Sequence, residues 1–222
     1  MLAAGDARGA PDEEARFLVR LPGKPGHVDA ACDALAEIAA GRPAEAEVSL
    51  RRAIEAQPGF AGAKQQLAAL LLLQDKGDDA LTFATEALSR QETNETKQTF
   101  ARALLKATFR PDAALRERLR RAVAEAWLDP QELAPICAAV IKAHPIIAPA
   151  ILRVSEQWSK AAAAQQHIPI SDAEIASLED PLVVAYLSTR PNYDIELERF
   201  LVAARANKEA LAAAEKAWVL SP

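Results

Sequence analysis

The sequence is poor in aromatic residues, which make up only 5% of its 222 positions although half of all residues are hydrophobic. Much of the apolar content is instead alanine, in runs such as AAAAQQ and ALAAAEKAW. Alanine is the best helix former and is depleted in strands. Because its side chain is small, helices with many alanines can approach closely. The composition therefore predicts an all-α fold with no sheet.

Cysteine and histidine are also scarce, which limits metal and nucleophile chemistry. Cys32 and Cys137 lie far apart without CxxC spacing, a pattern typical of small buried residues in a reducing compartment. His27, His144 and His167 are scattered, and none has a second ligand at a metal-binding spacing. A GxSxG elbow and a glycine-rich cofactor or phosphate loop are missing as well. We therefore expect no catalytic, cofactor-binding or metal-binding residue in this chain.

Long apolar runs are a further absence. None approaches the ~20 residues that cross a bilayer, and the N-terminal sequence is too polar for a signal peptide. The 26 basic and 31 acidic residues give a formal charge of −5, which argues against nucleic acid or an anionic membrane as the main partner. These features predict a cytoplasmic protein whose partner is a protein or peptide.

A period of 34 residues is the clearest positive feature. Ala46 and Ala53 recur as Ala80 and Ala87, and a third unit keeps the period at Ala114. Small residues at a fixed 34-residue spacing, with proline at a repeat end, resemble the tetratricopeptide repeat. That repeat is a helical hairpin that cannot bury its apolar face alone and stacks on its neighbours. The resemblance implies a right-handed α-solenoid.

The domain organisation follows from where this period begins and ends. We expect a partly helical segment at residues 1–26 and tetratricopeptide-like hairpins at 27–126, two of them clear and one degenerate. A non-repeat helical extension should occupy 127–222. Proline and glycine breaks along the chain predict ten or eleven helices.

The extension carries clear helix-start signals. Ser171 and Glu174 have the spacing of a capping box. Asp180 can cap a helix whose first residue is Pro181, a favoured first position.

A cluster of carboxylates in RPNYDIELERFLVAAR raises the question of an acid/base site. Glu196 and Glu198 are two residues apart, which is about 200° around a helix, so they cannot converge on one substrate atom. Acidic groups in a first turn are instead stabilised by the helix dipole, and Asn192 or Asp194 can cap the helix. We interpret the cluster as the start of a helix.

Three segments together resemble a more specific family. FARALLKATF, LRERLRRAVAEAWLDPQELAP and DPLVVAYLSTRPNYDIELERFLVAAR occur in this order, within residues 61–211. They resemble the N-terminal helical region of bacterial tetratricopeptide-repeat methyltransferases that use S-adenosylmethionine. The resemblance implies a methyltransferase domain downstream, and none of the matching residues is catalytic in kind. Those residues are Glu125, Trp127, Pro130 and Leu133 in one motif, and Pro191, Asp194, Leu197, Glu198, Arg199 and Leu201 in the other.

Tetratricopeptide arrays suggest where a partner would bind, because the first helix of each hairpin lines a concave groove. The groove is predicted to take an amphipathic helix or an extended peptide with one apolar end. In the alternative, its apolar members are simply core, covered by the segment around Phe17 and Leu18. Mapped by the 34-residue offset, the groove residues are Leu35, Ile38, Gln65, Ala69, Leu72, Thr99, Ala103 and Lys106.

Two functions fit these features. The first is a non-catalytic interaction module that recruits a protein or peptide substrate to an enzyme domain. The second is a free-standing helical adaptor or chaperone. A self-contained enzyme does not fit, because no site has the residue types that chemistry requires. We expect no binding of S-adenosylmethionine by residues 1–222 alone.

Overall fold

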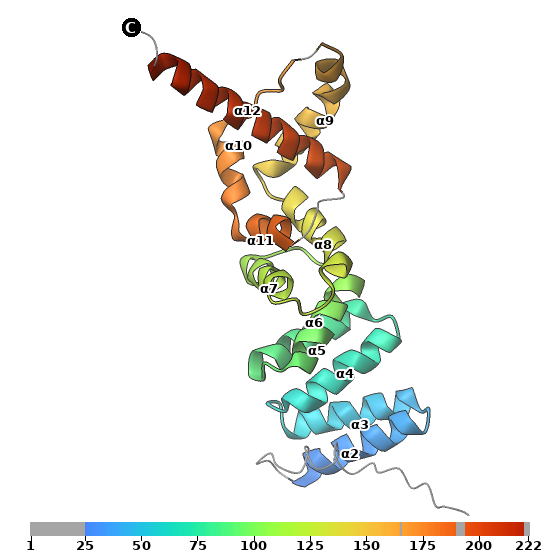
Figure 1. Ribbon diagram of the computed structural model, residues 1–222. Coiled ribbons are helices and arrows are strands. Elements are labelled where there is room, and N and C mark those ends of the chain that lie inside the picture. The colour runs from blue at the N-terminus through green and yellow to red at the C-terminus, as the bar shows by residue number, and fades with distance from the viewer. Residues whose placement is uncertain (1–24, 165, 190–193, 220–222) are drawn as a thin grey trace, which may run out of the picture. The chain divides into compact units, whose positions relative to one another are not determined.

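The computed structural model describes residues 25–164, 166–189 and 194–219, with the side chains of the last helix described as far as Glu209. These residues form eleven α-helices and one 3-10 turn, with no strand among them (Figure 1). The all-α prediction and the expected number of helices are therefore confirmed. The predicted segment 1–26 lies almost wholly outside the described residues.

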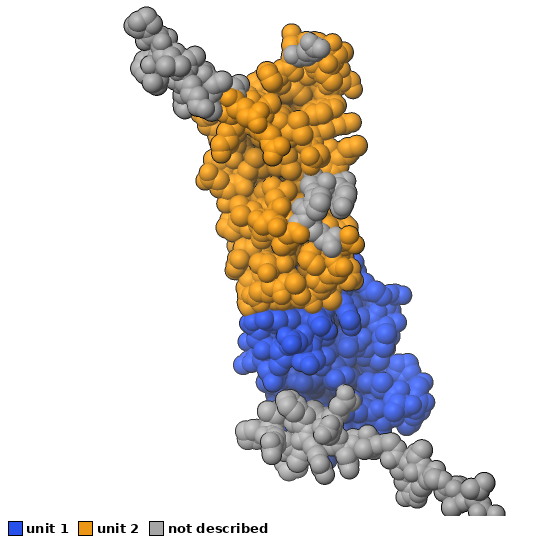
Figure 2. Space-filling model, viewed as in Figure 1, with its two compact units in different colours: residues 1–108 blue, residues 109–222 orange. Residues whose placement is uncertain are grey.

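The chain divides into two compact units, residues 1–108 (unit 1) and residues 109–222 (unit 2), coloured separately in Figure 2. The predicted repeat region at 27–126 therefore contributes to both units. The third predicted hairpin has its first helix in unit 1 and its second in unit 2.

Unit 1 is a succession of helices that pack against their neighbours in the chain, and α4 also packs against α6. Turns of three residues join α2 to α3 and α4 to α5, which is short enough to hold each pair side by side. The described helices of this unit are α2 (Pro25–Ala39), α3 (Pro43–Ala56), α4 (Ala61–Leu73), α5 (Gly77–Arg90) and α6 (Asn94–Lys106).

The repeated alanines lie in the core of unit 1. Ala46, Ala53, Ala80 and Ala87 are all fully buried, as their 34-residue recurrence predicts. Their small side chains leave room for close helix contact. Ala114, the third position in the series, is exposed instead. The turn before its helix has six residues rather than three, and this shifts the buried face of the third pair.

Unit 2 contains the remaining helices, and α11 packs against both α7 and α8. The last helix, α12, packs against α9. The described elements of this unit are α7 (Ala113–Ala124), α8 (Pro130–Lys142), α9 (Ile147–Ala164), α10 (Asp172–Ala176), η1 (Ser177–Glu179), α11 (Pro181–Thr189) and α12 (Ile195–Val219).

The predicted helix starts in unit 2 are confirmed. Ser171 and Glu174 form the capping box of α10. Asp180 accepts hydrogen bonds from the second and third backbone amides of α11, at 2.9 and 3.4 Å. Asp194 caps α12 by accepting from its third amide at 2.9 Å. The other predicted cap, Asn192, lies outside the described residues.

Ion pairs hold two of these helix starts in place. Arg116 on α7 binds Asp180 at 2.9 Å and donates a second hydrogen bond to the carbonyl of Val140 on α8. Lys142, the last residue of α8, binds Asp194 at 2.6 Å. The starts of α11 and α12 are therefore fixed to α7 and α8 by partly buried charges.

No single helix among those described is long and apolar enough to cross a membrane. Helices α8 and α9 meet the length and composition criteria only as a pair, and the pair is bent by 95°.

Candidate functional site

The first helices of successive pairs in unit 1 are related by two different offsets. Residues of α2 and α4 that are 34 apart share the same burial, as do Ala34 and Ala68. The turn before α4 has four residues, whereas the turn before α6 has three. From α4 to α6 the offset is therefore 33 residues, and the matching buried pairs are Ala63 and Thr96, Leu67 and Phe100, Leu70 and Ala103, and Leu71 and Leu104.

The shorter turn changes which residues of α6 face outward. Thr99 and Ala103, which the 34-residue offset assigns to the groove, are only 7% and 0% exposed. The α6 residue that corresponds to Ala69 is Arg102, which is exposed. A single uniform period in the sequence could not reveal this one-residue change in register.

The other predicted groove residues lie on the first helices, at intermediate or full exposure. Lys106 is exposed and donates to the carbonyl of Leu72 at 3.1 Å and to the carboxylate of Asp75. Phe17 and Leu18, which would cover this face in the alternative interpretation, lie outside the described residues. The partly buried members are Leu35, Gln65, Ala69 and Leu72, and Ile38 is 37% exposed.

Leu35 and Gln65 line a cavity of about 350 Å³, which we call the unit 1 cavity. Its wall comes from α2, α3 and α4, and from the turn and first residues of α6. This volume lies within the range of about 300–1,000 Å³ that is typical of ligand sites. The full lining is Ala31, Leu35, Leu50, Ala61, Gly62, Ala63, Gln65, Gln66, Gln91, Thr93, Glu95 and Thr96.

The lining combines small apolar side chains with free amide groups. Gln65 donates a weak hydrogen bond to Thr99, at 3.4 Å. The side-chain amides of Gln66 and Gln91 make no hydrogen bond with any described residue. Because an amide both donates and accepts, these side chains suit a partner with peptide groups.

The threonines at the edge of the cavity are already committed to structure. Thr93 and Thr96 form the capping box at the start of α6. The Thr96 hydroxyl also donates to the backbone carbonyl of Gln91, at 2.8 Å. This ties the turn before α6 to the helix and fixes that side of the cavity.

Glu95 supplies the only charge in the lining. Hydrogen bonds from its own backbone amide and from the Thr93 side chain hold the pKa of Glu95 below its ordinary value of 4.5. The carboxylate is therefore ionised at neutral pH. No Lys or Arg among the described residues forms an ion pair with it.

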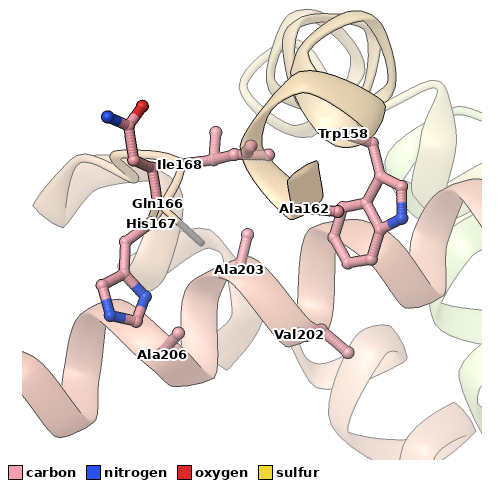
Figure 3. A pocket seen from close by; sticks show the side chains of 9 residues that line it. Trp158, Ala162, Gln166, His167, Ile168, Val202, Ala203 and Ala206 are labelled. Atoms are coloured by element: carbon pink, nitrogen blue, oxygen red, sulfur yellow. The ribbon is translucent and has the colours of Figure 1, made fainter. Parts of the chain in front are cut away.

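Unit 2 has a smaller cavity of about 160 Å³, the unit 2 cavity, between α9, α12 and the segment that follows α9 (Figure 3). Trp158 and His167 lie toward opposite ends, and Ala203 and Ala206 lie along α12 between them. The lining is mainly apolar and holds no carboxylate or lysine. It comprises Trp158, Ala161, Ala162, Gln166, His167, Ile168, Val202, Ala203 and Ala206.

Polar contacts hold the wall of the unit 2 cavity. Asn207 on α12 donates to the carbonyl of Ile168 at 2.7 Å and accepts from the amide of Ile170 at 3.2 Å. Arg153 on α9 forms a two-pronged ion pair with Glu174, at 2.7 and 2.8 Å. These groups are consumed in positioning the segment and leave little polar chemistry for a ligand.

The residues that carry the family resemblance have structural roles. The indole of Trp127 is buried and donates to Glu125 at 2.8 Å, and Leu133 is fully buried. Arg199 lies over the ring of Trp158, with 5.6 Å between the guanidinium carbon and the ring centre. These contacts account for the motifs through packing within unit 2.

Reactive side chains offer little chemistry in the described part of the chain. Burial raises the pKa of the Cys137 thiol to about 12, so it is not a thiolate at neutral pH. No group of three or more His, Cys, Asp or Glu side chains within the described residues could hold a metal ion.

Sequence reasoning missed most of the unit 1 cavity. One available signal was the pair Gln65 and Gln66, two polar residues inside the otherwise apolar AGAKQQLAALLLL. Gln91 and Glu95 gave no such signal, because they reach the cavity only through the turn that returns the chain to α6.

Comparison with protein-family models, with curated proteins and with solved structures finds no match for this chain.

Proposed function

We propose that this chain is a non-catalytic interaction module that holds a protein or peptide segment in the unit 1 cavity. The observation that carries the proposal is the lining of that cavity. It combines an apolar floor with glutamine amides that lack partners among the described residues. Such a surface suits a chain that offers both side chains and peptide groups.

The proposal extends to the architecture and biological role. Successive helix pairs with offsets of 34 and 33 residues support tetratricopeptide-like hairpins that stack into a solenoid. The methyltransferase resemblance supports a role in bringing a protein or peptide substrate to an S-adenosylmethionine-dependent enzyme domain in the bacterial cytoplasm. In this role the chain itself binds no cofactor, and its main partner is neither nucleic acid nor membrane.

A free-standing adaptor or chaperone would use the same cavity. The reading frame beyond Pro222 separates the two roles. Continuation into a strand, a GxGxG turn and a helix supports recruitment to a methyltransferase. An immediate stop codon favours the adaptor.

The test of binding uses a library of capped random heptapeptides and the immobilised full chain. The Gln66→Trp variant places an indole in the lining of the cavity, and Glu55→Trp places one on the exposed surface of α3, outside the lining. We expect the parent and Glu55→Trp to retain peptides, and Gln66→Trp to retain at least about tenfold less. Far-ultraviolet circular dichroism checks that both variants fold.

Failure of the parent to retain any peptide would overturn the proposed function. Equal retention by the parent and a folded Gln66→Trp variant would place binding elsewhere on the chain.

A further inference from the structure

We infer that the unit 1 cavity selects a peptide in which a lysine or arginine lies within two residues of an apolar side chain. This inference rests on the proposed function and adds the chemistry of the partner. Glu95 would bind the cation, the apolar floor would take the neighbouring side chain, and the glutamine amides would bind the peptide backbone.

The charge of the cavity is the first support. Glu95 is the one charged residue in a lining that contains no lysine, arginine or histidine. The nearby cations are committed elsewhere, since Lys64 binds Glu86 and Lys97 binds Glu92. A peptide cation would therefore meet a carboxylate that has no competing partner among the described residues.

The position of Arg102 sharpens this point. It is the only arginine on α6 and lies seven residues after Glu95, which is about 10 Å along a helix. Neither residue appears in an ion pair within the described part of the chain. Arg102 is also absent from the lining, so the cavity itself keeps a negative edge.

The apolar floor is the second support. Leu35, Leu50, Ala31, Ala61 and Ala63 give the cavity width without filling it, because three of the five are alanine. A volume of about 350 Å³ has room for an aliphatic side chain and the adjoining backbone. An acidic neighbour would be repelled by Glu95 at this edge.

The amides are the third support. Gln66 and Gln91 come from α4 and from the turn before α6, so they reach the cavity from two elements. A peptide group has one donor and one acceptor, and each glutamine amide can satisfy either. Because such bonds do not depend on peptide sequence, selectivity falls to Glu95 and the apolar floor.

The test measures which peptides the chain retains from the capped heptapeptide library. The parent should enrich lysine and arginine about two- to fivefold over the input, as expected for a single exposed ion pair. Glu95→Gln should abolish this enrichment while still retaining peptides. Glu95→Lys should reverse it in favour of aspartate and glutamate.

The matched control is Glu55→Gln, which removes one exposed carboxylate from α3, outside the cavity. It should keep the parent's enrichment, which excludes an effect of overall charge. Retention without basic enrichment, or enrichment that survives in Glu95→Gln, would overturn this inference and leave the proposed function standing. Retention of no peptide at all would overturn both.

Discussion

Ala126 ends α7 with a backbone φ of 51°, in the left-handed region that favours glycine. The next backbone amide, that of Trp127, donates to the carbonyl of Ala122 at 2.9 Å and closes the helix end. The end of α2 has the same geometry, but with Gly41 at a φ of 69°. Two helices thus use one type of ending, and only one of them uses the residue that adopts it without strain.

Replacing Ala126 by glycine should therefore stabilise unit 2. The left-handed conformation costs a non-glycine residue roughly 1–2 kcal/mol, and the greater freedom of unfolded glycine offsets about 0.5–1 kcal/mol. We expect a net gain of about 0.5–1 kcal/mol in the free energy of unfolding, from urea denaturation followed by tryptophan fluorescence. Ala124→Gly, inside the last turn, is the control and should lose stability. A loss in both variants would contradict the argument.

His27 is a second residue whose type does not match its surroundings. Its side chain is fully buried, and neither ring nitrogen has a hydrogen-bond partner. The ring packs edge-on against Phe60, with 5.1 Å between ring centres. Burial of a polar group without a hydrogen bond costs about 1–3 kcal/mol.

His27→Leu should consequently raise the stability of unit 1 by about 1–2 kcal/mol, because leucine has no polar atom to desolvate. The exposed His167→Leu is the control and should change stability by less than about 0.5 kcal/mol. Chemical denaturation at pH 7.5, followed by far-ultraviolet circular dichroism, measures both. If His27→Leu is clearly less stable than the parent, the imidazole makes a favourable contact that leucine cannot replace.

At the scale of helices, Gly77 determines how closely α5 approaches the end of α6. A Cβ atom on Gly77 would lie 2.2 Å from the carbonyl oxygen of Lys106 and 2.9 Å from the backbone nitrogen of Ala107. Both atoms are backbone, so a side chain could be accommodated only if the helices moved. Glycine here serves close packing.

Gly77→Ala should therefore cost about 1–3 kcal/mol through overpacking. The control is Gly59→Ala, since a Cβ there meets nothing within 4 Å. It should be neutral or stabilising by up to about 1 kcal/mol. Thermal melts followed by circular dichroism compare them, and equal melting temperatures for the two variants would show that α5 and α6 can separate freely.

The start of α11 should give unit 2 an acid-sensitive element. Burial pushes the pKa of Asp180 upward, but hydrogen bonds from Arg116 and from the first amides of α11 outweigh it. The pKa therefore lies below its ordinary value of 3.8. Stability from this ionised group is fully present above the unfolded pKa and is lost as the pH falls through the folded one.

Asp180→Asn should remove part of this pH dependence. Asparagine still caps a helix but has no charge for Arg116, so the variant should lose about 1–2 kcal/mol at pH 7. The difference from the parent should shrink as the pH falls below about 4. Urea denaturation between pH 2 and 7 measures it, with Asp172→Asn as a control that removes an exposed carboxylate. A difference that stays constant with pH would contradict the role of the charge.

At the scale of the whole molecule, the sequence predicted elements better than the site. Helix starts at Ser171, Asp180 and Asp194 follow from local chemistry, so they could be recognised directly. The buried alanines followed from their period. The α6 side of the groove was misplaced because one residue fewer in a turn rotates a helix by about 100° relative to the expected pattern. Turn length depends on how the pairs pack, which a repeat period does not encode.

Aromatic residues are unevenly divided between the two compact units. All three tryptophans, Trp127, Trp158 and Trp218, have positions in unit 2, and so do both tyrosines. Tryptophan fluorescence therefore reports on unit 2, whereas events in the unit 1 cavity need an introduced probe. A photoreactive residue in the cavity supplies one.

The most direct measurement is photocrosslinking of the full chain to the most enriched library heptapeptide. Benzoylphenylalanine is placed at Gln66, in the cavity, or at Glu55, on the outer face of α3, and the adducts are quantified by mass spectrometry. The account predicts an adduct from position 66 that exceeds the one from position 55 by about tenfold or more, and that an excess of unlabelled peptide abolishes. Equal adducts at the two positions, or an adduct at position 55 alone, would contradict the claim that the unit 1 cavity is the binding site.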